Sequence, residues 1–90
     1  MKVNFKKLSV EALFGEFMEV DVTKELGNYI HSQTNDIGLD DTARAIYYSE
    51  GEIEMPANHA TMIRTLVNQQ DCMLLAFVKK AIIKNLTENG

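Results

Sequence analysis

The sequence predicts an α+β domain that is mostly helical, with about four helices packed on a short antiparallel sheet of two or three strands. Alternating apolar and polar residues occur near the N-terminus and again around residue 53, as in half-buried strands. Elsewhere apolar residues recur at three- and four-residue spacing, as in helices that bury one face. With 90 residues, 46% of them hydrophobic, the chain is expected to form a single domain, 1–90, whose residues 87–90 fray.

The strands are expected at Lys2 to Leu8, Phe17 to Val22 and Glu52 to Met55. In the first, Val3 and Phe5 share the inward side, and in the second Met18, Val20 and Val22 do so. The stretch SVEALFG between them is interpreted as a long connection that turns at Gly15. The first two strands would therefore form an antiparallel hairpin.

The first helix is expected to follow Asp21, whose carboxylate can accept the free amide protons of the first turn, and to end near Thr34. Val22, Leu26 and Ile30 form its inward stripe. Gly27 costs about 1 kcal/mol relative to alanine inside a helix. Its presence indicates a close crossing with another element.

The second helix is expected to be capped by Asp40 or Asp41 and to end before Gly51, a residue suited to the left-handed position after a helix. Pro56 ends the last strand and can begin a helix, because the first turn does not need its missing amide proton. The third and fourth helices are expected at Ala57 to Asn68 and at Cys72 to Leu86, the latter capped by Asp71.

The apolar face of the fourth helix is wide, which favours either a central position in the domain or contact with a partner. Tyr48 follows the inward-facing Tyr47 by one residue, about 100° around the helix, and should be partly exposed. Exposed tyrosine is enriched at protein interfaces. The candidate interface residues are Tyr48, Leu75, Val78, Ile82 and Ile83.

The charge balance does not favour nucleic acid, because 13 acidic against 9 basic residues give a net charge of −4. The lysines nevertheless gather near the two ends. A possible basic patch comprises Lys2, Lys6, Lys7, Lys79, Lys80 and Lys84. The first two helices also resemble a helix-turn-helix in outline, but the second carries Arg44 against Asp40, Asp41 and Glu50.

Few residues suggest chemistry. His59 near three glutamates could be a general base, but no nucleophile motif accompanies it, and the interpretation as a helix-edge residue is favoured. His31 near a helix end has a stabilising role in its cationic form. Cys72 is interpreted as a small buried residue. The histidines and the cysteine form no paired zinc ligands, and TNDIGLDD lacks the glycine and glutamate spacing of a calcium loop. We expect no enzyme, cofactor or metal.

A single cysteine excludes an internal disulfide and is typical of a reducing compartment. The start MKVNFKKLSV lacks the apolar centre of a signal peptide. The most apolar run, MLLAFVKKAII, is too short to span a membrane. The expected location is the cytoplasm.

The segment from Glu19 to Met55, with VDVTKELGN, GLDDTARAIYYSEG and the short strand after it, resembles small uncharacterised proteins encoded by bacterial prophages and related mobile elements. The resemblance implies a bacterial or phage origin and no catalytic residue. The expected function is that of a small non-enzymatic accessory protein that binds another protein or itself. The alternative is a nucleic-acid-associated regulator that uses the terminal lysines.

Overall fold

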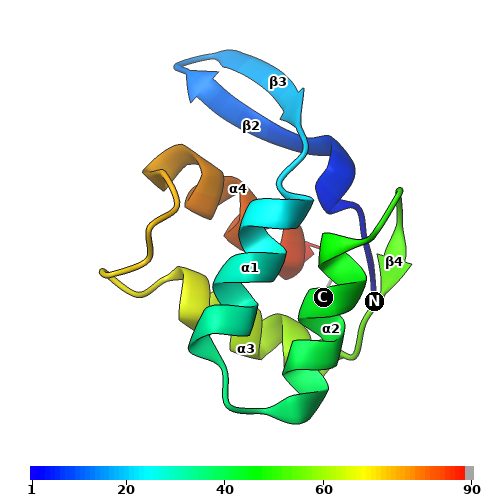
Figure 1. Cartoon of the computed structure of the whole chain (residues 1–90). Helices are drawn as coiled ribbons and strands as arrows, with labels where there is room; N and C mark the ends of the chain where they lie inside the picture. The colour runs from blue at the N-terminus through cyan, green and yellow to red at the C-terminus, as the bar shows by residue number, and fades with distance from the viewer. Residues whose placement is uncertain (89–90) are drawn as a thin grey trace.

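The computed structural model describes residues 1–88 and confirms an α+β fold (Figure 1). The helices of the described part are α1 (Thr23–Gln33), α2 (Ile37–Tyr47), α3 (Ala57–Val67) and α4 (Ala76–Glu88). The strands are β1 (Lys2–Val3), β2 (Leu8–Leu13), β3 (Glu16–Val20) and β4 (Ile53–Glu54), with the short 3-10 helix η1 (Phe5–Lys7) between β1 and β2. Residues 89–90, part of the segment expected to fray, lie outside the described residues.

The strands form two separate antiparallel pairs, β1 with β4 and β2 with β3, where we expected one sheet. The expected first strand is interrupted at Asn4, because the Asn4 side chain accepts hydrogen bonds from the amides of Lys6 (3.1 Å) and Lys7 (3.2 Å). Such a local side-chain acceptor competes with a strand ladder and bends the chain into η1. Val3 and Phe5 are nevertheless both buried, as expected.

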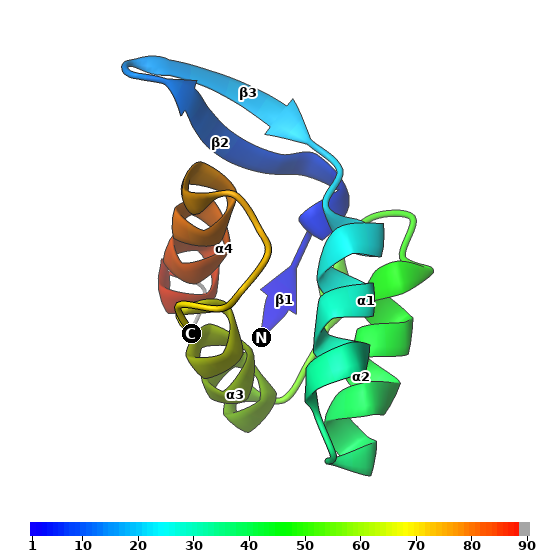
Figure 2. The ribbon, with the colours of Figure 1, turned by 60° about the vertical axis from the view of Figure 1, so that its left-hand side comes forward.

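The β2 strand of the β2–β3 hairpin occupies the stretch that we expected to be a long connection, whereas β3 overlaps the expected second strand. Gly15 is the turn residue, as predicted, and its φ of 80° is a conformation that favours glycine. The hairpin projects beyond the helices and lies above α4 (Figure 2). β2 contacts α4 and buries Val10, whereas the cross-strand neighbour of Val10, Met18, is exposed. The inward placement of Met18 was therefore wrong.

The α1 and α2 helices form a closely packed antiparallel pair, which Figure 1 shows side by side. A Cβ atom added at Gly27 would lie 2.8 Å from the Cβ of Tyr47, so the close crossing predicted at Gly27 is confirmed. Asp21 accepts hydrogen bonds from the hydroxyl (2.6 Å) and amide (3.0 Å) of Thr23, and these bonds lower the pKa of Asp21. It thus serves the first turn as predicted, one residue before the N-cap position, Val22.

The α2 helix begins earlier than expected. Asp36 is its N-cap and accepts a hydrogen bond from the amide of Leu39 (2.8 Å), so the assignment of the cap to Asp40 or Asp41 was wrong. Thr34 supports the cap, because its hydroxyl oxygen accepts a hydrogen bond from the Asp36 amide (3.0 Å). Asp36, Asp40 and Asp41 lie close together in the sequence, and only the tertiary path of the chain determines which of them caps α2.

The α4 helix begins at Ala76, four residues later than predicted. The preceding residues are not helical: Cys72 is buried and Leu74 half-buried against the core, whereas Met73 between them is exposed. This alternation closes the side of the core between α3 and α4. The predicted helix had included Cys72 and Leu74, which instead lie in the loop before α4 and hold this loop against the core.

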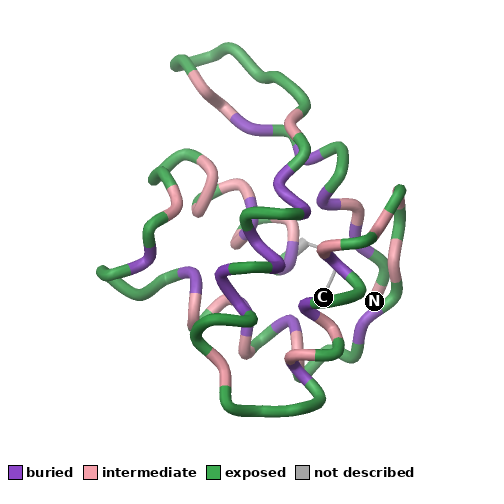
Figure 3. The backbone as a smooth tube through the Cα atoms, viewed as in Figure 1, coloured by how far each residue is buried: buried purple, intermediate pink, exposed green. Residues whose placement is uncertain are grey.

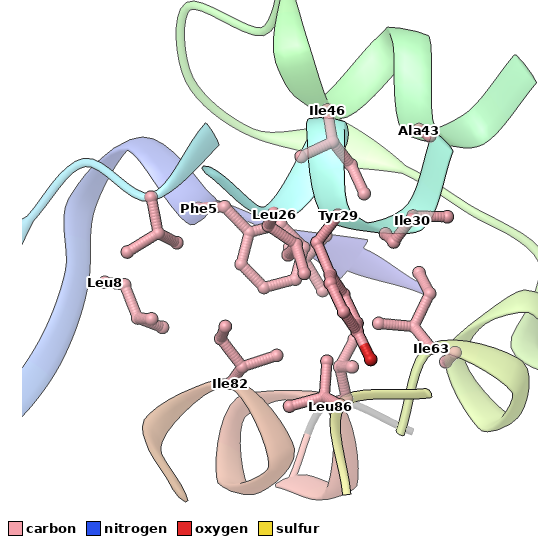
Figure 4. Packing of buried hydrophobic residues seen from close by; sticks show 14 of the residues in the cluster. Phe5, Leu8, Leu26, Tyr29, Ile30, Ala43, Ile46, Ile63, Ile82 and Leu86 are labelled. Atoms are coloured by element: carbon pink, nitrogen blue, oxygen red, sulfur yellow. The ribbon is translucent and has the colours of Figure 1, made fainter. Parts of the chain in front are cut away.

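The core lies between the α1–α2 pair and the α3–α4 pair, beneath the base of the hairpin (Figures 3 and 4). Its largest fully buried side chains come mainly from η1, β2 and the helices α1 to α4. They include Phe5, Leu8, Leu26, Ile30, Leu39, Ile46, Ile63, Ile82 and Leu86. The N-terminus closes one side of the core, since Met1 and Met55 exchange backbone hydrogen bonds of 3.0 and 2.9 Å.

Candidate functional site

The β2–β3 hairpin carries the main concentration of exposed large apolar side chains in the described residues. We call these side chains the hairpin surface: Leu13, Phe14, Phe17 and Met18. Phe14 at the tip is fully exposed, and Phe17 is 63% exposed. The register pairs Leu13 with Glu16 and Glu11 with Phe17, so charged and apolar groups are neighbours on this ribbon.

A groove of about 450 Å³ is lined by residues of both the hairpin and α4. We call it the α4 groove. Its lining is mainly apolar and aromatic, with lysines along the helix side: Leu8, Ser9, Glu11, Phe14, Phe17, Ala76, Phe77, Lys80, Ala81, Lys84 and Asn85. Phe77 is 37% exposed although it belongs to the first turn of a packed helix. The groove therefore combines aromatic rings from the hairpin and from α4.

The C-terminal lysines gather on α4, but the N-terminal lysines do not join them in the groove. Lys80 and Lys84 line the α4 groove and a second hollow of about 590 Å³ along the same helix, which Lys79 also lines. Lys6 pairs instead with Asp21 at 3.4 Å, and Lys2 lies opposite Glu54 in the β1–β4 pair. The lining of neither hollow includes an N-terminal lysine.

The candidate interface residues divide into three groups. Tyr48 and Leu75 are exposed, and the partial exposure expected for Tyr48 is confirmed. Val78 and Ile83 are half-buried against the core. Ile82 is fully buried and belongs to the core, so its assignment to an interface is corrected. The reason is that α4 directs Ile82 toward the interior, so part of the wide apolar face of this helix is buried in the core.

Sequence reasoning missed Phe14 and Phe17, the most prominent members of the hairpin surface. The sequence pattern predicts Phe14 in a connection and Phe17 as the first residue of a half-buried strand. One feature could have identified them: two large apolar residues, Leu13 and Phe14, directly precede the turn glycine, Gly15. Loop tips are usually polar, so an apolar tip indicates contact with something else.

A polar pocket of about 280 Å³ lies on the surface of the α1–α2 pair. A hydrogen bond joins His31 Nδ1 to Asp40 in this pocket, a pairing that sequence reasoning missed. The other residues of the lining with polar side-chain groups are Asn28, Arg44, Tyr47 and Tyr48. The lining contains no serine, cysteine, threonine or lysine. The His31–Asp40 pair links the end of α1 to the first turn of α2.

His59 forms a hydrogen bond through its Nδ1 atom to the hydroxyl of Thr42 at 2.7 Å. The partner is therefore a hydroxyl group of α2 and not a carboxylate that would orient a general base. His59 is half-buried at the start of α3. This geometry agrees with the helix-edge interpretation, and it fastens α3 to α2.

Tyr29 is the buried titratable group with the clearest perturbation. Its hydroxyl donates a hydrogen bond to the carbonyl oxygen of Leu66 at 2.8 Å. Burial, followed by the neighbouring Cys72 and Asp71, raises the pKa of Tyr29 to about 12. Cys72 itself is buried, as expected.

We expect alkaline pH to destabilise the fold through Tyr29. In the unfolded chain the phenol ionises near its ordinary pKa of 10.0, whereas the folded protein retains the proton up to about 12. Stability from the neutral phenol is therefore fully present below the unfolded value and is lost as pH rises through the folded one. The loss amounts to about 2–3 kcal/mol. Urea unfolding from pH 9 to about 12 should show it.

The control for this prediction is Tyr29→Phe, which cannot ionise. The variant should be less stable by about 1 kcal/mol at neutral pH, because the Leu66 carbonyl loses one of its donors. Its stability should then fall less steeply above pH 10. Equal slopes for the two proteins would contradict the raised pKa.

Within residues 1–88 no three His, Cys, Asp or Glu side chains lie close enough together to hold a metal ion. No helix in this described range combines the length and the apolar character needed to cross a membrane. Among known proteins, no family model matches the chain, and neither a curated protein nor a solved structure is significantly similar to it. The hairpin surface and the α4 groove are therefore the features on which a functional proposal rests.

Proposed function

We propose that this protein is a small non-enzymatic accessory protein, of the kind that prophages and mobile elements encode, which acts in the cytoplasm by binding protein through the hairpin surface. The single observation that carries the proposal is the full exposure of Phe14 at the tip of a projecting hairpin. An aromatic side chain buries about 150–250 Å² when it is covered. Aromatic residues that are buried on association often provide much of the binding energy.

The neighbourhood of Phe14 supports this proposal. Phe17 and Phe77 line the same groove, so Phe14 belongs to an aromatic cluster rather than being an isolated surface residue. Monomeric proteins rarely expose apolar patches larger than a few hundred Å², and larger ones mark contact sites. Lys80, Lys84 and Glu11 around the cluster match the polar rim of protein interfaces.

The non-enzymatic part of the proposal is supported by the roles of the two histidines. His31 and His59 each hydrogen-bond to a side chain of α2, and both bonds connect one helix to another. Neither brings a serine or cysteine nucleophile with it. A structural use of both groups accounts for their positions without a reaction.

The test is site-specific photo-crosslinking in the cells that produce the protein. A photoreactive phenylalanine analogue at Phe14 should give discrete protein adducts, because this side chain lies within the proposed contact. The matched control is the same analogue at Ile37, which is 82% exposed at the start of α2 and outside the hairpin surface. Adducts at Phe14 but not at Ile37 are the expected result. No adduct at Phe14, or equal labelling at the two positions, would overturn the proposal.

A further inference from the structure

The polar pocket on the α1–α2 pair lies where these two helices cross at small residues. Gly27 of α1 and Ala43 of α2 belong to its lining, and a Cβ atom at Gly27 would lie 3.0 Å from the Ala43 carbonyl oxygen. The longer side chains of the lining come from both helices: Asn28, His31, Asp40, Arg44, Tyr47 and Tyr48. The hollow therefore results from a close crossing of small residues that long side chains surround.

Arg44 is a cation that lacks a partner in this pocket. Asp40 precedes it by one helical turn, a spacing at which opposite charges often pair. The Asp40 carboxylate is instead hydrogen-bonded to Nδ1 of His31 on α1. In the described part of the chain the Arg44 guanidinium forms neither an ion pair nor a hydrogen bond. The His31–Asp40 pair thus leaves Arg44 available to a bound group.

Two tyrosine rings form another part of the lining. The rings of Tyr47 and Tyr48 meet edge to face, with centroids 4.8 Å apart and an interplanar angle of 74°. Nζ of Lys24 lies 4.4 Å from the centroid of Tyr47, so this ring already contacts a cation. Tyr48 is 69% exposed. The pocket therefore offers a ring that a flat apolar group can cover, one helical turn from the unpaired guanidinium.

We propose that this pocket binds a small aromatic carboxylate, whose acid group pairs with Arg44 and whose ring covers Tyr48. The planar fork of a guanidinium donates two parallel hydrogen bonds to a carboxylate. The amide group of Asn28 supplies a further donor in the lining. The volume of about 280 Å³ is slightly below the usual range for drug-sized ligands, which favours a single ring with one acid group.

The charge of Asp40 distinguishes a carboxylate from a phosphate. Asp40 belongs to the lining and repels any anion that Arg44 attracts. A phosphate group carries up to two negative charges near neutral pH, so this repulsion is larger for phosphate than for a singly charged carboxylate. The net charge of −4 acts in the same direction.

This pocket shares no lining residue with the α4 groove and includes no member of the hairpin surface. The inference therefore goes beyond protein binding by the hairpin and does not depend on it. It assigns a second, separate contact region to the α1–α2 pair, which Figure 1 shows on the side of α1 away from α4.

The test is a titration of the full-length chain with sodium benzoate at constant ionic strength, followed by NMR of the backbone amides and of the Asn28 and Arg44 side chains. We expect saturable shifts at these groups and at Tyr48, with a Kd on the order of 1 mM, as for a ligand of one ring. Acetate lacks the ring and should bind about two- to tenfold more weakly. Inorganic phosphate should also bind more weakly than benzoate.

Arg44→Gln should weaken benzoate binding about tenfold, because it removes a charge-assisted pair. Arg64→Gln is the matched control. Arg64 lies on α3, where its side chain bonds to Thr61 (3.2 Å) and Thr87 (3.4 Å), and it does not line the pocket. This control should leave the benzoate affinity unchanged. Circular dichroism verifies that both variants fold.

Tyr48→Leu separates the role of the ring from that of the charge. It should lower the affinity for benzoate toward that for acetate and leave acetate binding unchanged, because only benzoate has a ring to place on Tyr48. An effect of equal size on both ligands would show that Tyr48 does not contact the benzoate ring, and would contradict the assignment of an aromatic ligand.

The inference would be overturned if benzoate caused no saturable shift in the pocket or shifted only residues along the α4 groove. It would also be overturned if Arg44→Gln bound benzoate as tightly as Arg64→Gln does, or if phosphate bound more tightly than benzoate. These outcomes are independent of the crosslinking of Phe14. Failure of the ligand site and failure of the proposed function are therefore distinguishable.

Discussion

Replacement of Phe5 with alanine should lower the free energy of unfolding by about 3–5 kcal/mol, because it removes a buried aromatic ring and leaves a cavity. Phe5 is 1% exposed and lies among Leu8, Leu26 and Ile82 in the core (Figure 4). Phe5 also belongs to the single turn η1, and its backbone carbonyl oxygen accepts a hydrogen bond from the Val22 amide at 2.9 Å. The loss would come from packing. Equilibrium urea unfolding followed by circular dichroism measures it.

The matched control is Phe14→Ala, which removes the same side chain from a fully exposed position. At protein concentrations too low for association it should change stability by less than about 0.5 kcal/mol. Comparison of the two variants separates the contribution of a phenylalanine in the core from that of a phenylalanine on the surface. A loss at Phe14 as large as that at Phe5 would show that the hairpin tip is packed, and would contradict its assignment to a free contact surface.

Substitution of Gly27 with valine should destabilise the protein by about 3 kcal/mol, because the α1–α2 crossing has no room for a side chain. A Cβ atom at this position would lie 2.8 Å from Tyr47 Cβ, 3.0 Å from the Ala43 carbonyl oxygen and 3.1 Å from Tyr47 Cα. Two of these neighbours are backbone atoms, so a rotamer change cannot relieve the contact. The helices would have to separate. Thermal unfolding monitored by circular dichroism gives the comparison.

Gly51→Ala is the control for Gly27→Val. Its added Cβ would meet no atom within 4 Å, and φ at Gly51 is not positive, so the left-handed position expected for Gly51 was wrong. Alanine restricts the unfolded chain, so the variant should be unchanged or more stable by about 0.4–1 kcal/mol. If Gly27→Val were as stable as the wild type, the close packing of α1 on α2 would be excluded.

The variants at Phe5, Gly27 and Phe14 should affect different properties of the protein. Phe5 and Gly27 support the fold and do not contribute to the hairpin surface. Phe14 contributes to that surface and not to the core. A variant that folds normally and loses association is therefore expected only at the hairpin or along the α4 groove.

Apolar periodicity by itself determined the helical character of the chain and most of its core. The inward stripe of Leu26 and Ile30 is buried as predicted, and so is Ile63 on α3. These positions depend on helix geometry alone, since residues three or four apart share a face wherever the helix packs. The turn at Gly15 and the crossing at Gly27 were likewise predictable, because each needs a residue without a Cβ atom.

The ends of elements depended on competition between nearby groups. Asp36, and not Asp40, caps α2. The Asn4 side chain ends the first strand by accepting hydrogen bonds from two backbone amides. Cys72 became a loop anchor although it continues the helical pattern of α4. Which residue caps or ends an element depends on where the neighbouring elements lie. A local sequence pattern does not contain this information.

The candidate site was the least predictable part. Alternation placed Met18 inward and a wide helical face included Ile82, but burial depends on which face of an element meets another element. Because α4 packs mainly against β2, the hairpin keeps Phe14 and Phe17 exposed, while Ile82 turns into the core. The sequence thus determined which residues are apolar and which helices they form. Only the tertiary structure decided which apolar residues remain exposed, because exposure is a property of pairs of packed elements and not of one segment.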